Sequence, residues 1–271
     1  MGTPAARMAS VSARFLGAEL AAWRPEQGPR RIADFVDHTL LRAEAVRADI
    51  LKLCGEAKRH RFAAVCVNPH WVPLCGEELM DSGVAVATVC GFPLGATSFR
   101  VKAFEAAEVV RHGAVEVDMV AALGRMKGGE WGYVTDDIRA VVEAVAGTLV
   151  KVIIESAALT PEEIVRACEA AQAAGARFVK TSTGFHPSGG ASVEAVRLMR
   201  RTVGDALGVK ASGGIRDCGS ALRMLAAGAS RIGTSSGVAL AECLGPDPLP
   251  LGELLADPAR HAASCRTAPH G

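Results

Sequence analysis

One unit, repeated eight times, most constrains how this chain can fold. It consists of a short apolar run, a polar or glycine-rich loop, a segment with helical periodicity and a turn. The apolar runs contain many β-branched residues and are apolar on both faces, which indicates buried parallel strands. They cover residues 31–39, 62–69, 84–93, 114–120, 148–156, 176–184, 208–214 and 230–237.

The segments between these runs carry helix signals. Thr160, Pro161 and Glu163 form an N-terminal capping pattern, and Gly175 stands where the end of a helix favours glycine. A period of 3.6 residues is clear in six segments, and a shorter one at 71–80 is compatible with a helix. The six are residues 43–60, 98–113, 130–147, 160–175, 192–203 and 217–228.

Eight strand–helix units within roughly 215 residues predict an α/β fold, a closed (β/α)8 TIM barrel in a single domain. A doubly wound open sheet is the alternative, but no strand is followed by G-x-G-x-x-G and the glycine-rich turns come late. We expect the barrel to span residues 31–245. Residues 1–30 are expected to be an N-terminal extension, partly disordered or helical, and 246–271 a C-terminal tail with a short helix.

Composition excludes several classes of function. Lys plus Arg number 30 against 29 Asp plus Glu, so neither nucleic acid nor an anionic membrane surface is an expected partner. No long apolar stretch predicts a membrane span. The eight cysteines contain no C-x-x-C pair and several lie in apolar runs, so we expect reduced thiols and a cytoplasmic protein.

Two lysines end neighbouring predicted strands. The functional residues of a TIM barrel lie at the C-terminal ends of its strands, so Lys180 and Lys210 should meet in one pocket. Ammonium groups about 5 Å apart repel by roughly 3 kcal/mol, which lowers one pKa by about 2 units and yields a nucleophilic amine. The structural alternative is a pairing with Asp118 or Glu155. Lys151, earlier in its strand, should serve a structural ion pair inside the barrel more readily than catalysis.

The loops after the last strands predict a phosphate site, because that is where TIM barrels commonly bind phosphate. Backbone donors and hydroxyls would come from several strand ends. The expected binding residues are Thr183, Gly184, Ser212, Gly213, Gly214, Gly233, Ser235 and Ser236.

Eight motifs, in unbroken order over about residues 32–243, resemble the deoxyribose-phosphate aldolases, a family of class I aldolases. They are DHTLL (37–41), VCVNP (65–69), VCGFPLG (89–95), EVDMV (116–120), KVIIES (151–156), KTSTGF (180–185), VKASGGIR (209–216) and RIGTSS (231–236). Ser156 stands where many members have Thr.

The resemblance implies specific roles. Lys180 would form a Schiff base, Asp118 and Lys210 would transfer protons, and Asp37 would support Lys210. The reaction would be the reversible cleavage of 2-deoxy-D-ribose 5-phosphate into D-glyceraldehyde 3-phosphate and acetaldehyde, in the breakdown of deoxynucleosides. The resemblance also implies that the enzyme needs no cofactor and forms a homodimer or homotetramer.

Other interpretations remain open. A phosphosugar isomerase or synthase could use the same fold, and a sugar-phosphate sensor could keep the pocket without using both lysines. His38 and His186 lie near strand ends, but no histidine and carboxylate have the spacing of a metal site, so we expect no metal. Cys66 in its apolar strand is expected to be a buried small residue.

Overall fold

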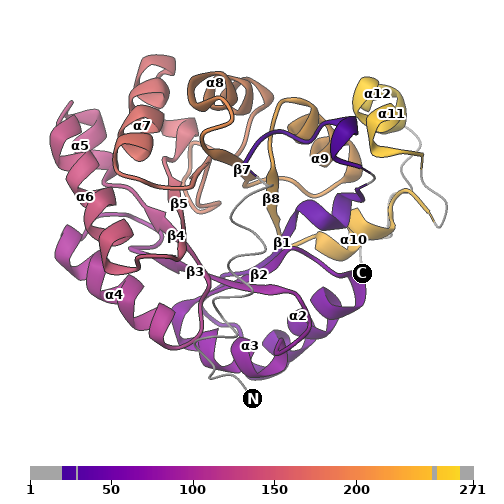
Figure 1. Ribbon diagram of the computed structural model, residues 1–271, viewed down its shortest axis with the longest axis horizontal. Coiled ribbons are helices and arrows are strands. Elements are labelled where there is room, and N and C mark those ends of the chain that lie inside the picture. The colour runs from indigo at the N-terminus through magenta and orange to yellow at the C-terminus, as the bar shows by residue number, and fades with distance from the viewer. Residues whose placement is uncertain (1–19, 29, 246–248, 263–271) are drawn as a thin grey trace.

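The computed structural model describes residues 20–28, 30–245 and 249–262, and it confirms the predicted barrel (Figure 1). Eight parallel strands close in chain order, from β1 to β8 and back to β1. Their bounds are Val36–Leu40 (β1), Ala64–Val67 (β2), Ala85–Cys90 (β3), Glu116–Val120 (β4), Leu149–Ile153 (β5), Phe178–Lys180 (β6), Gly208–Ser212 (β7) and Arg231–Thr234 (β8).

Helices surround the strands, as the sequence predicted. They are Arg47–His60 (α2), Val72–Glu78 (α3), Phe99–Arg111 (α4), Trp131–Ala144 (α6), Pro161–Ala173 (α7), Val193–Val203 (α8) and Cys218–Ala226 (α9). The capping pattern of α7 forms as expected: Thr160 Oγ1 accepts from Glu163 N at 3.2 Å, and Glu163 Oε2 accepts from Thr160 N at 2.8 Å. No helix in the described ranges is long and apolar enough to cross a membrane.

Several short helices were not predicted individually. A 3-10 helix, Ile32–Phe35, precedes β1, because Asp34 accepts from the backbone N–H of Arg31 and turns the chain there. Two further ones are Leu123–Lys127 (α5) and Gly237–Glu242 (α10). In the C-terminal tail, where the sequence predicted one short helix, the structure has two, Leu251–Ala256 (α11) and Pro258–Ala262 (α12). Helices this short show little periodicity in sequence.

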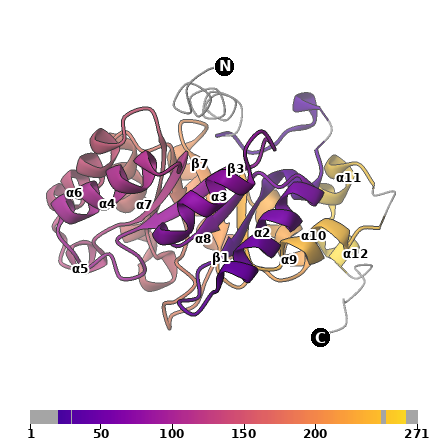
Figure 2. The same cartoon turned by 90° about the horizontal axis from the view of Figure 1, so that it is seen from below.

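The two segments that flank the barrel lie against it where they are described. Arg200 donates to the carbonyl of Leu20, and Arg24 pairs with Asp205 at 2.9 Å. Helices α11 and α12 pack beside α9 in both views (Figures 1 and 2), and they bury Leu251 and Leu254. Residues 1–19, 29, 246–248 and 263–271 lie outside the described residues, so the boundaries at 31 and 246 stay predictions.

One expectation about the cysteines is wrong. Cys218, at the start of α9, forms a disulfide with Cys243 at the end of α10. The barrel brings their Cα atoms to 6.1 Å, although 25 positions separate them in sequence. Five other cysteines are free and buried as expected, namely Cys54, Cys66, Cys75, Cys90 and Cys168; Cys265 lies outside the described residues.

The interior of the barrel divides into two halves. Small apolar side chains from β2 and β3, including Ala64, Cys66, Ala85 and Ala87, fill one half. The other half is charged, because the register aligns ionisable residues of neighbouring strands. Asp118 lies level with Lys151, Lys180 with Lys210, and Lys210 with Arg231.

A buried ion pair between α4 and α6 holds these two helices beside β4. Lys102 of α4 donates to Asp137 of α6 at 2.7 Å and to the carbonyl of Val120 at 2.8 Å, and both ionic side chains are fully buried. Asp137 also accepts from the backbone N–H of Ala122 at 3.2 Å. These contacts join α4 and α6 to the end of the strand that carries Asp118.

The Lys102→Met variant should lose about 3–5 kcal/mol of unfolding free energy in urea denaturation, because Asp137 remains buried without its cation. Burial already raises the pKa of Asp137, and Lys102 opposes that effect. The loss should therefore be smaller at about pH 4, where Asp137 binds a proton in the folded variant, than at about pH 8. Lys127→Met, at an exposed 2.8 Å pair with Glu163, is the control, with an expected loss of less than about 1 kcal/mol. Similar losses in the two variants would contradict the prediction.

Candidate active site

Asp118 of β4 lies at the centre of a buried ion cluster. Its Oδ2 accepts from Lys180 Nζ at 2.8 Å and from Lys210 Nζ at 2.7 Å. Its Oδ1 accepts from Lys151 Nζ at 2.8 Å. Burial alone would raise the pKa of Asp118, but the three ammonium groups hold it well below its usual range. Asp118 is therefore a carboxylate whose oxygens are both occupied by lysines.

Asp37 of β1 extends the cluster on the side of Lys210. Lys210 Nζ donates to Asp37 Oδ2 at 2.5 Å. Burial would lower the pKa of Lys210, but Asp118 and Asp37 outweigh it and raise the pKa. The structure thus brings together the four side chains that the sequence singled out for chemistry: Asp37, Asp118, Lys180 and Lys210.

Lys180 differs from the other lysines of the cluster because a single carboxylate, Asp118, contacts it among the described residues. Burial is the main influence that lowers the pKa of Lys180; Asp118 opposes it, and Lys210 lowers the pKa further. The sequence argument gave the leading role to repulsion by Lys210. Lys210 acts in the expected direction but comes after burial, and Asp118, which contacts both ammonium groups, offsets their repulsion.

Sequence reasoning missed two members of the cluster, Glu116 and Arg231. Glu116 accepts from Lys151 at 2.5 Å and from Arg231 Nη2 at 2.7 Å. Arg231 Nη1 also lies 3.2 Å from Asp37 Oδ1. Lys151 is buried inside the barrel in ion pairs, the placement that the sequence favoured for it. Glu116 and Arg231 are the first residues of their strands, so a search confined to strand ends could not find them.

A cavity of about 320 Å³ opens above the cluster, between the loops that follow β1, β6, β7 and β8. Lys180 lines it together with most of the residues predicted to bind phosphate: Thr183, Gly184, Ser212, Gly213, Gly214, Gly233 and Ser235. Ser236 does not line it; this residue precedes α10, and its N–H donates to Thr234. Arg42 and Arg216, which the sequence argument left out, stand in the lining as well.

Two hydroxyls of the cavity are already bound within the protein. Thr183 Oγ1 donates to Glu155 Oε2 at 2.6 Å and accepts from Phe185 N. Ser212 Oγ donates to the carbonyl of Ser182 at 2.6 Å. These hydroxyls therefore shape the loop after β6 and are poorer candidates for direct ligand contacts than the backbone.

The glycines of the cavity are not equivalent. Gly214 has φ +81° and faces open space, whereas a Cβ at Gly233 would lie 3.0 Å from Lys210 Cε. A side chain at Gly233 would therefore press on Lys210 as well as on a ligand. Gly214 has the open surroundings that an approaching anion needs, and a Cβ at Gly184 would meet only Gly213 Cα, at 4.0 Å.

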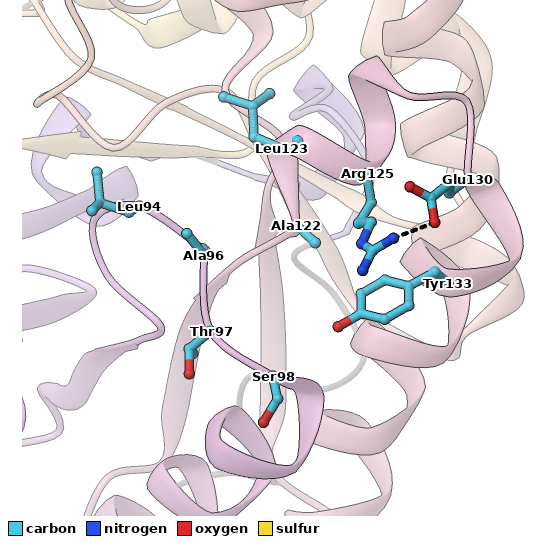
Figure 3. A pocket seen from close by; sticks show the side chains of 11 residues that line it. Leu94, Ala96, Thr97, Ser98, Ala122, Leu123, Arg125, Glu130 and Tyr133 are labelled. Carbon is cyan, nitrogen blue, oxygen red and sulfur yellow. Dashed lines mark hydrogen bonds and ion pairs between the residues drawn. The ribbon is translucent and has the colours of Figure 1, made fainter.

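A second cavity, of about 470 Å³, lies between the loops after β3 and β4 (Figure 3). Arg125 projects into it over the ring of Tyr133 and pairs with Glu130 at 2.5 Å. Lys180 is absent from its lining. Within the described residues no group of three or more His, Cys, Asp or Glu could hold a metal ion; His38 bonds Glu56 at 2.7 Å.

Comparison with protein families matches residues 32–241 to the DeoC/LacD family of aldolases. The chain belongs to this aldolase family. It is 55% identical over 212 residues to the deoxyribose-phosphate aldolase of Mannheimia succiniciproducens, covering 78% of this chain and 94% of that protein. The deoxyribose-phosphate aldolase of a Geobacillus species is 57% identical over 212 residues, with 78% and 95% covered.

A solved aldolase structure is similar as well. The deoxyribose phosphate aldolase of Aeropyrum pernix, described as a unique tetramer, matches with a TM-score of 0.73 and 32% identity. The match covers 88% of this chain and 97% of that one. The eight motifs read from the sequence are thus those of an aldolase of this family, and the TIM barrel agrees.

In this aldolase, Thr183→Val should loosen the loop after β6, because Glu155 loses the hydroxyl that donates to it. Leaving a buried acceptor without its donor costs about 1–3 kcal/mol. Hydrogen–deuterium exchange should become faster in residues 181–186 and change little in α4. Thr183→Ser keeps the hydroxyl and should exchange like the natural protein. Unchanged exchange in Thr183→Val would show that the Glu155 contact does not order the loop.

Proposed function

We propose that this chain cleaves 2-deoxy-D-ribose 5-phosphate reversibly into D-glyceraldehyde 3-phosphate and acetaldehyde through a Schiff base on Lys180. The observation that carries the proposal is the placement of Lys180 at the cavity, with one carboxylate contact and a lowered pKa. The relatives named deoxyribose-phosphate aldolase support the choice of substrate.

The Lys180 amine attacks the C1 aldehyde of the open-chain sugar, and loss of water leaves a protonated imine. Acetaldehyde contains two carbons, so the bond that breaks is C2–C3. The imine accepts its electron pair as an enamine, while the C3 hydroxyl loses a proton and C3 becomes the aldehyde of glyceraldehyde 3-phosphate. Protonation of the enamine at C2 and hydrolysis of the imine release acetaldehyde and the free amine.

Asp118 and Lys210 are proposed to move these protons. Asp118 Oδ2 contacts both Lys180 and Lys210, so it can pass a proton between them. Its low pKa means that Asp118 holds a proton only in transit and returns to the carboxylate. Asp37 keeps Lys210 in place through their 2.5 Å contact.

The phosphate is proposed to bind at the glycine-rich loops after β7 and β8. Gly214 presents an open backbone, and Arg216 follows the glycine pair in the same loop. Within the described residues no carboxylate pairs with Arg216, which leaves its guanidinium to bind an anion. We also propose a homodimer or homotetramer, which the tetrameric relative supports, and a cytoplasmic protein without a cofactor.

Borohydride in the presence of acetaldehyde should fix a two-carbon adduct on Lys180, which mass spectrometry of peptides can locate. Lys180 combines the cavity with a lowered pKa, whereas the pKa values of Lys151 and Lys210 are raised. Lys180→Met should abolish the adduct. An adduct on Lys151 or Lys210 would overturn the assignment, and no adduct at all would favour an isomerase or a sensor.

Arg216→Met should lower kcat/KM for 2-deoxyribose 5-phosphate about 10- to 100-fold, mainly through KM, because one charge-assisted contact contributes about 1.5–3 kcal/mol. The weak activity on unphosphorylated 2-deoxyribose should change little. Arg216→Lys keeps the positive charge and should lose less. Equal losses on the two sugars would show that Arg216 shapes the pocket rather than binds phosphate.

A further inference from the structure

Counted over the residues that the structure describes, the buried cluster contains one more cation than carboxylates. Within the described residues, ion pairs connect four cations, Lys151, Lys180, Lys210 and Arg231, with three carboxylates, Asp37, Glu116 and Asp118. All seven side chains are buried. If all were ionised, a net positive charge would remain in a low-dielectric interior, which burial disfavours. The loss of one proton leaves three cations against three carboxylates.

The contacts decide which cation loses that proton. Arg231 stays protonated at any pH the fold tolerates. Lys151 contacts Glu116 and Asp118, and Lys210 contacts Asp37 and Asp118. Lys180 has Asp118 alone, and it lines the cavity through which a proton can leave.

We propose that Glu116 and Arg231, which do not line the cavity, are positioning residues that set the charge of the cluster and so keep Lys180 as a neutral amine. The inference rests on the proposed function, in which Lys180 is the nucleophile. Arg231 supplies a permanent positive charge, bound to Glu116 at 2.7 Å and to Asp37 at 3.2 Å. Glu116 limits that charge to one surplus unit and anchors Lys151.

The other described groups near Lys180 do not change this balance. The thiol of Cys66, from β2, faces the lysines, but burial raises its pKa and it stays neutral. Glu155, after β5, is bound by the N–H and hydroxyl of Thr183 and has no ion pair with the cluster. Arg42 and Arg216 stand at the exposed side of the cavity, where solvent screens them.

The test compares the pH dependence of kcat/KM, and of adduct formation with acetaldehyde, in three variants. Arg231→Met leaves three ammonium groups and three carboxylates, so Lys180 keeps its proton more tightly. The acid limb of the pH profile, where protonation of Lys180 lowers kcat/KM, should move to higher pH by on the order of one unit. Glu116→Gln removes a carboxylate, so the acid limb should move to lower pH by a similar amount.

The double variant Arg231→Met with Glu116→Gln restores one surplus cation, and its acid limb should return toward that of the natural protein. A merely structural role for these residues would lower turnover without opposite shifts. Arg139→Met, at an exposed pair with Asp136, removes the same formal charge outside the cluster and should leave the limb in place.

The outcomes separate this inference from the proposed function. If peptides of the natural protein show no adduct on Lys180, the proposed function fails. If Lys180 forms the adduct but the two single variants shift the limb in the same direction, or not at all, the inference is overturned. Circular dichroism checks folding, and Glu116→Gln, which keeps an amide oxygen as acceptor, decides the question where Arg231→Met does not fold.

Discussion

The contact of one carboxylate, Asp118, with three lysines is the interaction on which the site depends. An isolated ammonium group buried in a protein interior costs several kcal/mol, and three would cost far more without partners. Asp118 compensates only part of this charge. Asp37 and Glu116 compensate more of it at the far side of Lys210 and Lys151, and they share their charge with Arg231. The cluster is therefore a single electrostatic unit, and no member keeps its environment if another is removed.

Closure of the barrel makes this unit possible. Residues of β1, β4, β5, β6, β7 and β8 contribute to it, and an open sheet would keep β1 and β8 apart. The 2.5 Å contact between Asp37 and Lys210 crosses that closing seam, as does the contact between Asp37 and Arg231. On the opposite side, small residues such as Ala64, Ala85 and Ala87 exclude water. Their apolar half keeps the effective dielectric low beside the lysines, and burial there lowers the pKa of Lys180.

The sequence predicted the eight strands, the main helices and the meeting of Lys180 with Lys210, because periodicity and position at strand ends are local signals. The roles of Asp37 and Asp118 came from the resemblance to the aldolase family. The sequence could not predict how charges at the two ends of the strands interact. Glu116 and Arg231 are 115 positions apart and begin their strands, and they meet across the interior of the closed barrel because β4 and β8 are not neighbours in the sheet. The pKa of Lys180 likewise depends on its burial and on the position of Asp118 between two lysines, which only the folded geometry fixes. The Cys218–Cys243 disulfide likewise follows from the packing of α9 and α10, which no spacing rule encodes.

The ion cluster and the glycine-rich loops use different groups, and this has a physical consequence. A phosphate dianion close to Lys180 would stabilise its ammonium form and oppose nucleophilic attack. The proposed phosphate loops follow β7 and β8, and Arg216 brings a positive charge of its own to the part of the cavity that they line. Binding the anion with backbone N–H groups and Arg216 leaves the balance of the cluster to Asp37, Glu116 and Asp118. In this arrangement the substrate phosphate and the Lys180 amine contact different groups of the protein. Tighter phosphate binding therefore need not return the proton to Lys180.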